Sequence, residues 1–92
     1  MTQESKGPVA TEMENRLRAA LNPAHLAVIN DSEQHRGHGG YDTESHFTVE
    51  IVADAFAGQN RVARQRMVNG ALGELMRDKI HALSIKARAP GE

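Results

Sequence analysis

The first apolar pattern along the chain is that of an amphipathic helix. Thr11 and Glu14 have the spacing of a capping box, which predicts that the helix begins at Thr11. Pro23 predicts its end. Residues 1–10 are polar, contain a Gly-Pro pair and show no period, so we exclude them as a disordered N-terminal tail. The apolar stripe of the helix recurs at helical spacing: Met13, Leu17 and Leu21.

Three short stretches have the pattern of β-strands. Residues 26–31 are β-branched in the middle and are followed by polar residues, and residues 47–51 alternate between apolar and polar. Residues 80–87 alternate in the same way and predict a third strand. Residues 32–45 are polar and rich in glycine, and they are far longer than a hairpin loop of roughly 2–5 residues. Such a length favours a functional or disordered loop.

A second helix is expected between the second and third strands. Gly58 marks a turn, and Asn60 is a typical N-cap residue. We expect this helix to be the longest. Pro90 and Gly91 then predict the end of order, so a single domain is placed at residues 11–88, followed by a flexible C-terminus at residues 89–92. The apolar stripe of this helix is Val68, Ala71, Leu72, Leu75 and Met76.

Composition narrows the function classes. The chain has 92 residues and a formal net charge of −1, so one small core is expected and no overall field draws it to nucleic acid or to an anionic membrane. It has no apolar run of spanning length and no targeting signal, so we expect a cytoplasmic protein. It has no cysteine. Any thiolate ligand of an iron–sulfur site must therefore come from another molecule.

Strand order is expected to bring four of the five histidines to one end of the sheet. The first two strands are joined without a helix and favour an antiparallel pair, whereas the helical crossover makes the second and third strands parallel. His81 opens the third strand and His46 opens the second. The loop that contains His35 and His38 is expected at this same end of the sheet, and His25 is expected at the opposite end. Imidazoles gathered in this way suit zinc, iron or copper.

A structural role for each histidine remains open on this pattern alone. His81 shares the parity of the apolar residues in its strand, which is also typical of a core-edge histidine that bonds a backbone carbonyl. His46, next to an aromatic residue, indicates a structural role, with metal ligation only as a secondary role. His35 and His38 lie where no packing demands them, which fits either a ligand or a solvated loop.

Three motifs in order give the chain a resemblance to the BolA family, from about residue 12 to residue 90. They are Ser45-His46-Phe47, then Phe56-x-Gly58 with Arg64-Gln65-Arg66-Met67-Val68, and finally His81-Ala82-Leu83-Ser84-Ile85. The resemblance implies an α/β fold of the class II KH-like (BolA-like) type, with element order αββααβ and a three-stranded mixed sheet packed against helices. This agrees with the elements predicted from the periodicity.

The resemblance also implies a partner and a cofactor. Proteins similar to BolA share a [2Fe-2S] cluster with a monothiol (CGFS-type) glutaredoxin, whose cysteine and bound glutathione supply the other ligands. The family's invariant histidine corresponds to His81, and its loop ligand corresponds to His35, with His38 as the alternative. The implied function is iron–sulfur cluster assembly or trafficking, or iron homeostasis, by a chain that is a monomer without cluster alone and a heterodimer with glutaredoxin. Mixed imidazole and thiolate ligation resembles a Rieske centre.

The main rival is a transcriptional regulator of the BolA type that binds DNA. Arg61, Arg64 and Arg66 open the second helix, where amide groups and basic side chains favour phosphate. On a helix the directions of Arg64 and Arg66 differ by about 200°, so all three side chains cannot face one groove. The family's Arg-His-Arg is Arg64-Gln65-Arg66 here, which weakens this interpretation.

The sequence allows one further kind of metal site and gives no sign of an enzyme. A zinc site could combine His81, His35 and His38 with Asp42 or Glu44. An enzyme is not expected, because the chain shows no phosphate-binding glycine loop, no nucleophile elbow and no paired catalytic carboxylates.

Overall fold

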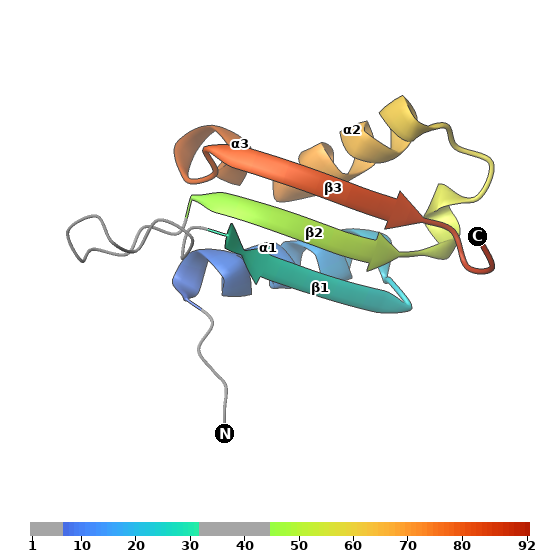
Figure 1. The fold of residues 1–92 in the computed structure, drawn as a ribbon, viewed down its shortest axis with the longest axis horizontal. Coiled ribbons are helices and arrows are strands. Elements are labelled where there is room, and N and C mark those ends of the chain that lie inside the picture. Colours follow the sequence, from blue (N-terminus) through green and yellow to red (C-terminus); the bar gives the residue numbers. More distant parts are fainter. Residues whose placement is uncertain (1–6, 32–44) are drawn as a thin grey trace, which may run out of the picture.

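A three-stranded sheet and a layer of helices make up the fold (Figure 1). The computed structural model describes residues 7–31 and 45–92. Its elements, in chain order, are α1 (Pro8–Leu21), β1 (His25–Asn30), β2 (His46–Val52), the 3-10 turn η2 (Asp54–Phe56), α2 (Arg61–Leu72), α3 (Leu75–Asp78) and β3 (Ala82–Arg88).

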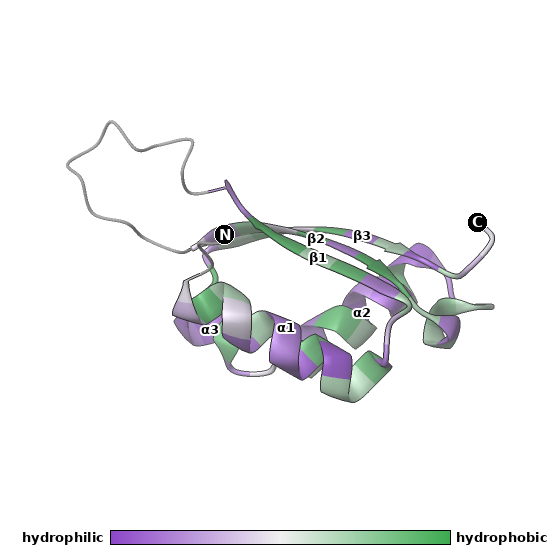
Figure 2. Ribbon diagram, turned by 90° about the horizontal axis from the view of Figure 1, so that it is seen from below, coloured by the Kyte–Doolittle hydropathy of each residue, from purple (hydrophilic) through white to green (hydrophobic). Residues whose placement is uncertain are grey.

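The sheet has the predicted mixed topology, with the order β1-β2-β3. β1 pairs antiparallel with β2, and β2 pairs parallel with β3. All helices lie against one face of the sheet, as the view along the sheet in Figure 2 shows. In the part of the chain that the structure describes, the other face carries no covering element.

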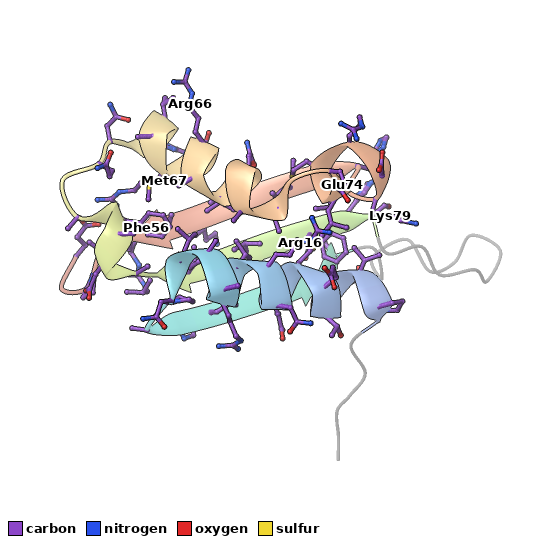
Figure 3. All side chains as sticks on the ribbon, turned by 180° about the vertical axis from the view of Figure 1, so that it is seen from behind. Arg16, Phe56, Arg66, Met67, Glu74 and Lys79 are labelled. Atoms are coloured by element: carbon purple, nitrogen blue, oxygen red, sulfur yellow. The ribbon has the colours of Figure 1, made fainter. Side chains whose placement is uncertain are left out.

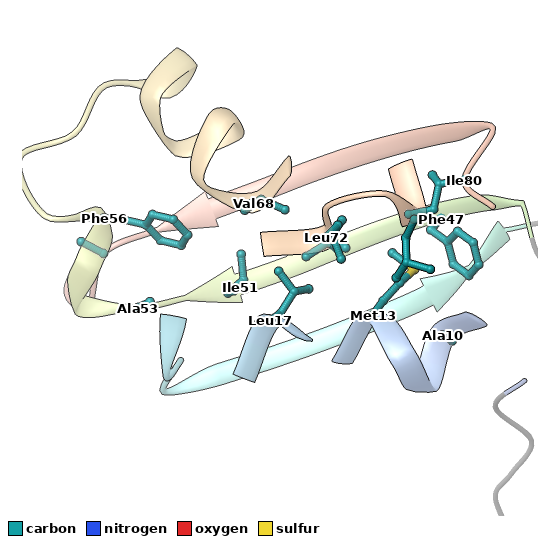
Figure 4. Close-up of a cluster of buried hydrophobic side chains, with 13 residues drawn as sticks. Ala10, Met13, Leu17, Phe47, Ile51, Ala53, Phe56, Val68, Leu72 and Ile80 are labelled. Atoms are coloured by element: carbon teal, nitrogen blue, oxygen red, sulfur yellow. The ribbon is translucent and has the colours of Figure 1, made fainter. Parts of the chain in front are cut away.

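The core lies between the sheet and the helices. Phe47, Val49 and Ile51 of β2 alternate with more exposed neighbours and are at most 2% exposed, as their period of two predicts. With only two phenylalanines in the sequence, the two largest fully buried side chains are Phe47 and Phe56, and Figure 4 shows Phe56 pointing into the cluster from η2. The helices contribute Met13, Leu17, Val68, Leu72 and Leu75 to the core.

No helix among residues 7–31 and 45–92 has the length and apolarity to cross a bilayer.

The first helix begins at Pro8 and not at the predicted Thr11. Gly7 is the N-cap residue and makes no side-chain cap hydrogen bond, and proline at the first helical position is favoured because its missing N–H would have no partner there. The Thr11 hydroxyl donates to the Gly7 carbonyl, at 3.0 Å, where the capping-box prediction had it accepting from a backbone amide. Ala10, which we had assigned to the tail, is 2% exposed. Packing of the first turn therefore extends the helix.

The second helix is shorter than predicted because it breaks at Gly73. Asn60 caps its start as expected, since its side-chain Oδ1 accepts the Ala63 N–H at 2.8 Å. Gly73 has φ +57° and ψ −133°, a conformation that L side chains rarely adopt, so α2 ends at 12 residues and α3 forms a separate four-residue helix. α1, with 14 residues, is longer than α2. The expectation that the second helix would be the longest was wrong.

Arg16 of α1 holds this helix break in place (Figure 3). Its Nη1 donates to the Leu72 carbonyl at 3.0 Å, at the last residue of α2. Its Nε donates to Glu12 at 2.8 Å, and its Nη2 lies 3.7 Å from Glu74. The hydrogen bond to Glu12, followed by the charges of both carboxylates, raises the pKa of Arg16. One guanidinium thus satisfies a helix-end carbonyl that would otherwise lack a partner.

Candidate functional site

His81 is fixed to the start of β2 by its backbone. It lies directly before β3, and the sheet register pairs the next residue, Ala82, with His46. The backbone N–H groups of His81 and Ala82 both donate to the Ser45 carbonyl, at 2.7 and 3.1 Å. The crossover through α2 and α3 therefore returns His81 to the point where β2 begins.

The imidazoles of His81 and His46 lie against each other. Their ring centroids are 5.3 Å apart and their planes differ by 10°, which is a stacked arrangement. His81 is exposed and His46 is half-buried. The alternative of a core-edge His81 that bonds a backbone carbonyl is not borne out, because the residue is exposed.

The long segment between β1 and β2 meets the sheet at this same end. Asn30 pairs with Phe47 at the end of β1, so Asp31 and Ser45 flank the segment beside the histidine pair. The loop residues that we proposed as ligands, His35, His38, Asp42 and Glu44, lie outside the described residues. The antiparallel register confirms that His25 is at the far end of the sheet, opposite Val52.

The histidine pair alone does not make a complete metal centre. Among residues 7–31 and 45–92, no three side chains of His, Cys, Asp or Glu gather in a way that would hold a metal ion. His46 and His81 can offer two imidazole nitrogens at most. This donor set fits a centre that takes its other ligands from elsewhere, and it does not fit a self-contained zinc site within the described part of the chain.

The three arginines singled out for DNA binding do not form one surface. Arg64 and Arg61 border a groove between α2 and β3 that Arg66 does not line. Figure 3 shows Arg66 directed away from the sheet. The divergence expected from the helical spacing is therefore present, and the two directions separate within a single turn of α2.

Arg64 is also engaged inside the chain. Its Nη1 and Nη2 donate to the two carboxylate oxygens of Glu92, each at 2.7 Å, and its Nε donates to the Gln59 carbonyl at 2.8 Å. Nη1 additionally donates to the Ala87 carbonyl at 3.2 Å. The hydrogen bond to Glu92 raises the pKa of Arg64. The side chain ties the end of β3 to the start of α2.

Sequence reasoning missed this pair because it assigned residues 89–92 to a flexible terminus. In the structure, Ala89 is 6% exposed, and Gly91 has φ +89°, which turns the chain back so that Glu92 reaches α2. The Pro90-Gly91 sequence carried the signal, because this dipeptide marks a turn as readily as an end of order. The stacking of His46 on His81 left no such signal in the sequence.

The comparisons decide the family. Residues 17–92 match the family model described as BolA-like protein. The chain belongs to the BolA family. The BolA match covers α2, α3 and all three strands, and it includes both His46 and His81.

Relatives and solved structures of BolA proteins agree with this assignment. The chain is 47% identical over 83 residues to an uncharacterised protein of Sinorhizobium sp., named for its place in the cobS 5′ region, and the match covers 87% of this chain and 89% of the relative. It is 40% identical over 87 residues to chloroplastic BOLA1 of Arabidopsis thaliana, covering 90% of this chain and 54% of that protein. The BolA domain of SufE1 from Arabidopsis thaliana has a TM-score of 0.82 at 36% identity, covering 94% of this chain and 96% of that domain. The element order and mixed sheet are those of the BolA-like fold.

Proposed function

We propose that this BolA-family chain is a binding adaptor in iron–sulfur cluster assembly or trafficking. In this proposal it shares a [2Fe-2S] cluster with a monothiol glutaredoxin, through His81 and one histidine of the 32–44 segment. The observation that carries the proposal is the exposed imidazole of His81, held beside the two ends of that segment. The cytoplasmic location expected from the sequence stays a prediction.

The donor chemistry supports a shared cluster. The chain has no cysteine, so it can contribute nitrogen ligands but no thiolate. A glutaredoxin with glutathione would contribute the sulfur ligands. Neutral imidazole is a borderline ligand that accepts iron, and its replacement of a thiolate raises the reduction potential of such a cluster.

The residues of this chain position the ligand. The Ser45 carbonyl fixes the backbone on either side of His81, and the flat ring of His46 limits the planes that the His81 ring can adopt. An imidazole must be neutral to coordinate a metal, so a proton and the cluster would compete for the same ring nitrogen. A ligand that is rigidly placed but released by a proton suits reversible sharing.

The test is to titrate the full chain into a cluster-loaded monothiol glutaredoxin. A heteromeric species with a new visible absorption and circular dichroism spectrum is expected. His81→Ala should abolish that species, whereas the matched control His25→Ala, at the opposite end of the sheet, should leave it unchanged. Unchanged spectra with His81→Ala would contradict the proposal. Stoichiometric zinc retained by the isolated chain would favour the zinc site instead.

Substitution of each histidine in the 32–44 segment tests which of them is the second ligand of the cluster. His35→Ala is expected to weaken the shared cluster, and His38→Ala is expected to have the smaller effect. Light scattering reports the mass of the complex, so loss of the heterodimer can be separated from loss of colour alone. Because either histidine could replace the other, the double variant decides: an unchanged spectrum with His35→Ala/His38→Ala would show that neither histidine is a ligand.

A further inference from the structure

A basic groove runs along β3 at the end of the sheet away from His81. It has a volume of about 350 Å³ and lies between the start of α2 and the second half of β3. Ile85 and Ala87 contribute apolar surface to it. No aspartate or glutamate lines it. We use the name basic groove for this surface, whose cationic residues are Arg61, Arg64, Lys86 and Arg88.

Arg64, one of the residues that line the groove, already binds a carboxylate from within the chain. The two oxygens of Glu92 meet the two terminal nitrogens of Arg64 at 2.7 Å each, which is the bidentate geometry that arginine makes with carboxylates. One of these oxygens also accepts the Ala89 N–H at 3.1 Å. The hydrogen bond from Arg64, then that from Ala89, lowers the pKa of Glu92 to about 2, so the group is ionised at neutral pH.

Groups other than Glu92 also hold the Arg64 side chain in place. Its side chain is 15% exposed, and the carbonyls of Gln59 and Ala87 hold the guanidinium in place. A guanidinium fixed by other groups loses little entropy when it binds a carboxylate. Glu92, by contrast, is 43% exposed and is reached through a turn at Gly91. In the ion pair of Arg64 with Glu92, the Glu92 carboxylate is therefore the side chain that a competing ligand would displace.

The remaining charges exceed what Glu92 can neutralise. Arg61, Lys86 and Arg88 border the groove, and no ion pair joins any of them to an acid in the described residues 7–31 and 45–92. Of the four cations, Glu92 forms an ion pair with Arg64 alone, and the charge of Arg88 also lowers its pKa. An extended acidic segment could pair with several of them at once, which a single internal glutamate cannot do.

We propose that the basic groove binds an acidic segment of a partner polypeptide, with a glutamate or aspartate of that segment replacing Glu92 on Arg64. Glu92 then acts as an internal competitor for the Arg64 guanidinium. A carboxylate-bearing polypeptide is favoured over a nucleic acid, because Arg64 of this groove already binds a carboxylate in bidentate geometry. This inference concerns a different end of the sheet from the proposed cluster site, and either can fail alone.

The experiment measures binding of a fluorescein-labelled octaglutamate peptide to the full chain by fluorescence anisotropy at low ionic strength. Glu92→Gln should bind the peptide about fivefold to tenfold more tightly than the original chain, because removal of the competing carboxylate raises the fraction of chains in which Arg64 is available. Arg61→Gln and Arg64→Gln should weaken binding. The matched control is Arg66→Gln, on the same helix but outside the groove, which should bind like the original chain.

Three outcomes would overturn the proposal. The first is an affinity that Glu92→Gln leaves unchanged, and the second is an equal loss with Arg66→Gln and Arg61→Gln, which would indicate diffuse charge attraction. The third is tighter, groove-dependent binding of a single-stranded oligonucleotide than of octaglutamate. Labelled octaglutamine should not bind, and competition by inorganic phosphate separates a general anion site from a peptide site. Circular dichroism checks folding; if Arg64→Gln does not fold, the pair Lys86→Gln and Arg88→Gln replaces it.

Discussion

His46 and His81 stack with ring centroids 5.3 Å apart, although 34 residues separate them in the sequence. The contact follows from the parallel pairing of β2 with β3, which sets His46 opposite Ala82. The crossover connection and the strand register together therefore bring the two imidazoles into contact.

The stacking contact predicts a positioning role for His46. His46→Phe keeps a flat ring beside His81 and should preserve formation of the shared cluster, whereas His46→Ala removes the ring and should weaken it. Both can be followed by the visible dichroism of the complex with a monothiol glutaredoxin. Equal loss in the two variants would mean instead that the nitrogen of His46 is required as a ligand.

Phe56 predicts where stability is concentrated. It is fully buried at η2 and closes the core between β2 and α2. Phe56→Ala should lower the free energy of unfolding by about 3–5 kcal/mol, since it removes a large side chain and leaves a cavity. Val62→Ala is the control: Val62 is 55% exposed, so its loss should stay within about 0.5 kcal/mol. Urea unfolding of both variants measures the difference.

Gly73 and Gly70 should respond to alanine with opposite signs. Gly73 has φ +57°, and a Cβ there would lie 3.3 Å from Nη1 of Arg16, so Gly73→Ala should destabilise the fold by about 1–3 kcal/mol. Gly70 lies within α2, and a Cβ there would meet nothing within 4 Å. Gly70→Ala should stabilise by about 0.5–1 kcal/mol, because alanine is the better helix former. A loss of stability in both would contradict this account of the helix break.

The depressed pKa of Glu92 predicts a pH dependence. Its pKa falls from an ordinary 4.5 to about 2 in the folded chain, chiefly through the hydrogen bond from Arg64. The unfolded state therefore binds the proton first, and the stabilising contribution is present above pH 4.5 and is lost as the pH falls toward 2. The stability difference between the original chain and Glu92→Gln should be constant at neutral pH and shrink over this interval. A difference that persists at pH 2 would argue against the ion pair.

The sheet was predictable because its signals are local and periodic. Alternation identified residues 47–51 as a strand with one buried face, and the rules for crossovers placed the starts of β2 and β3 together. The position of His81 at the end of the sheet that carries the long segment follows from those two facts. The BolA family could be inferred from the three motifs that contain His46, Arg64 and His81, and the match to the family model confirms it.

The parts that sequence reasoning missed depend on contacts between distant residues. The start of α1 is set by burial of Ala10, which overrides the capping signal at Thr11. The break at Gly73 depends on Arg16, which supplies a partner for a helix-end carbonyl from another helix. The pairing of Arg64 with Glu92 spans 28 positions, and no periodic pattern encodes it.

The Ser45 carbonyl accepts hydrogen bonds from the backbone N–H groups of His81 and Ala82. These two bonds form a joint that fixes the backbone of residue 45 against that of residue 81. Any sequence inserted or exchanged between Asp31 and Ser45 would still be delivered to that joint. Variation in this interval can alter which atoms meet His81, while the anchor itself stays where it is. The domain is accordingly a natural host for grafted segments, in which new donor sets could be tried against an unchanged imidazole.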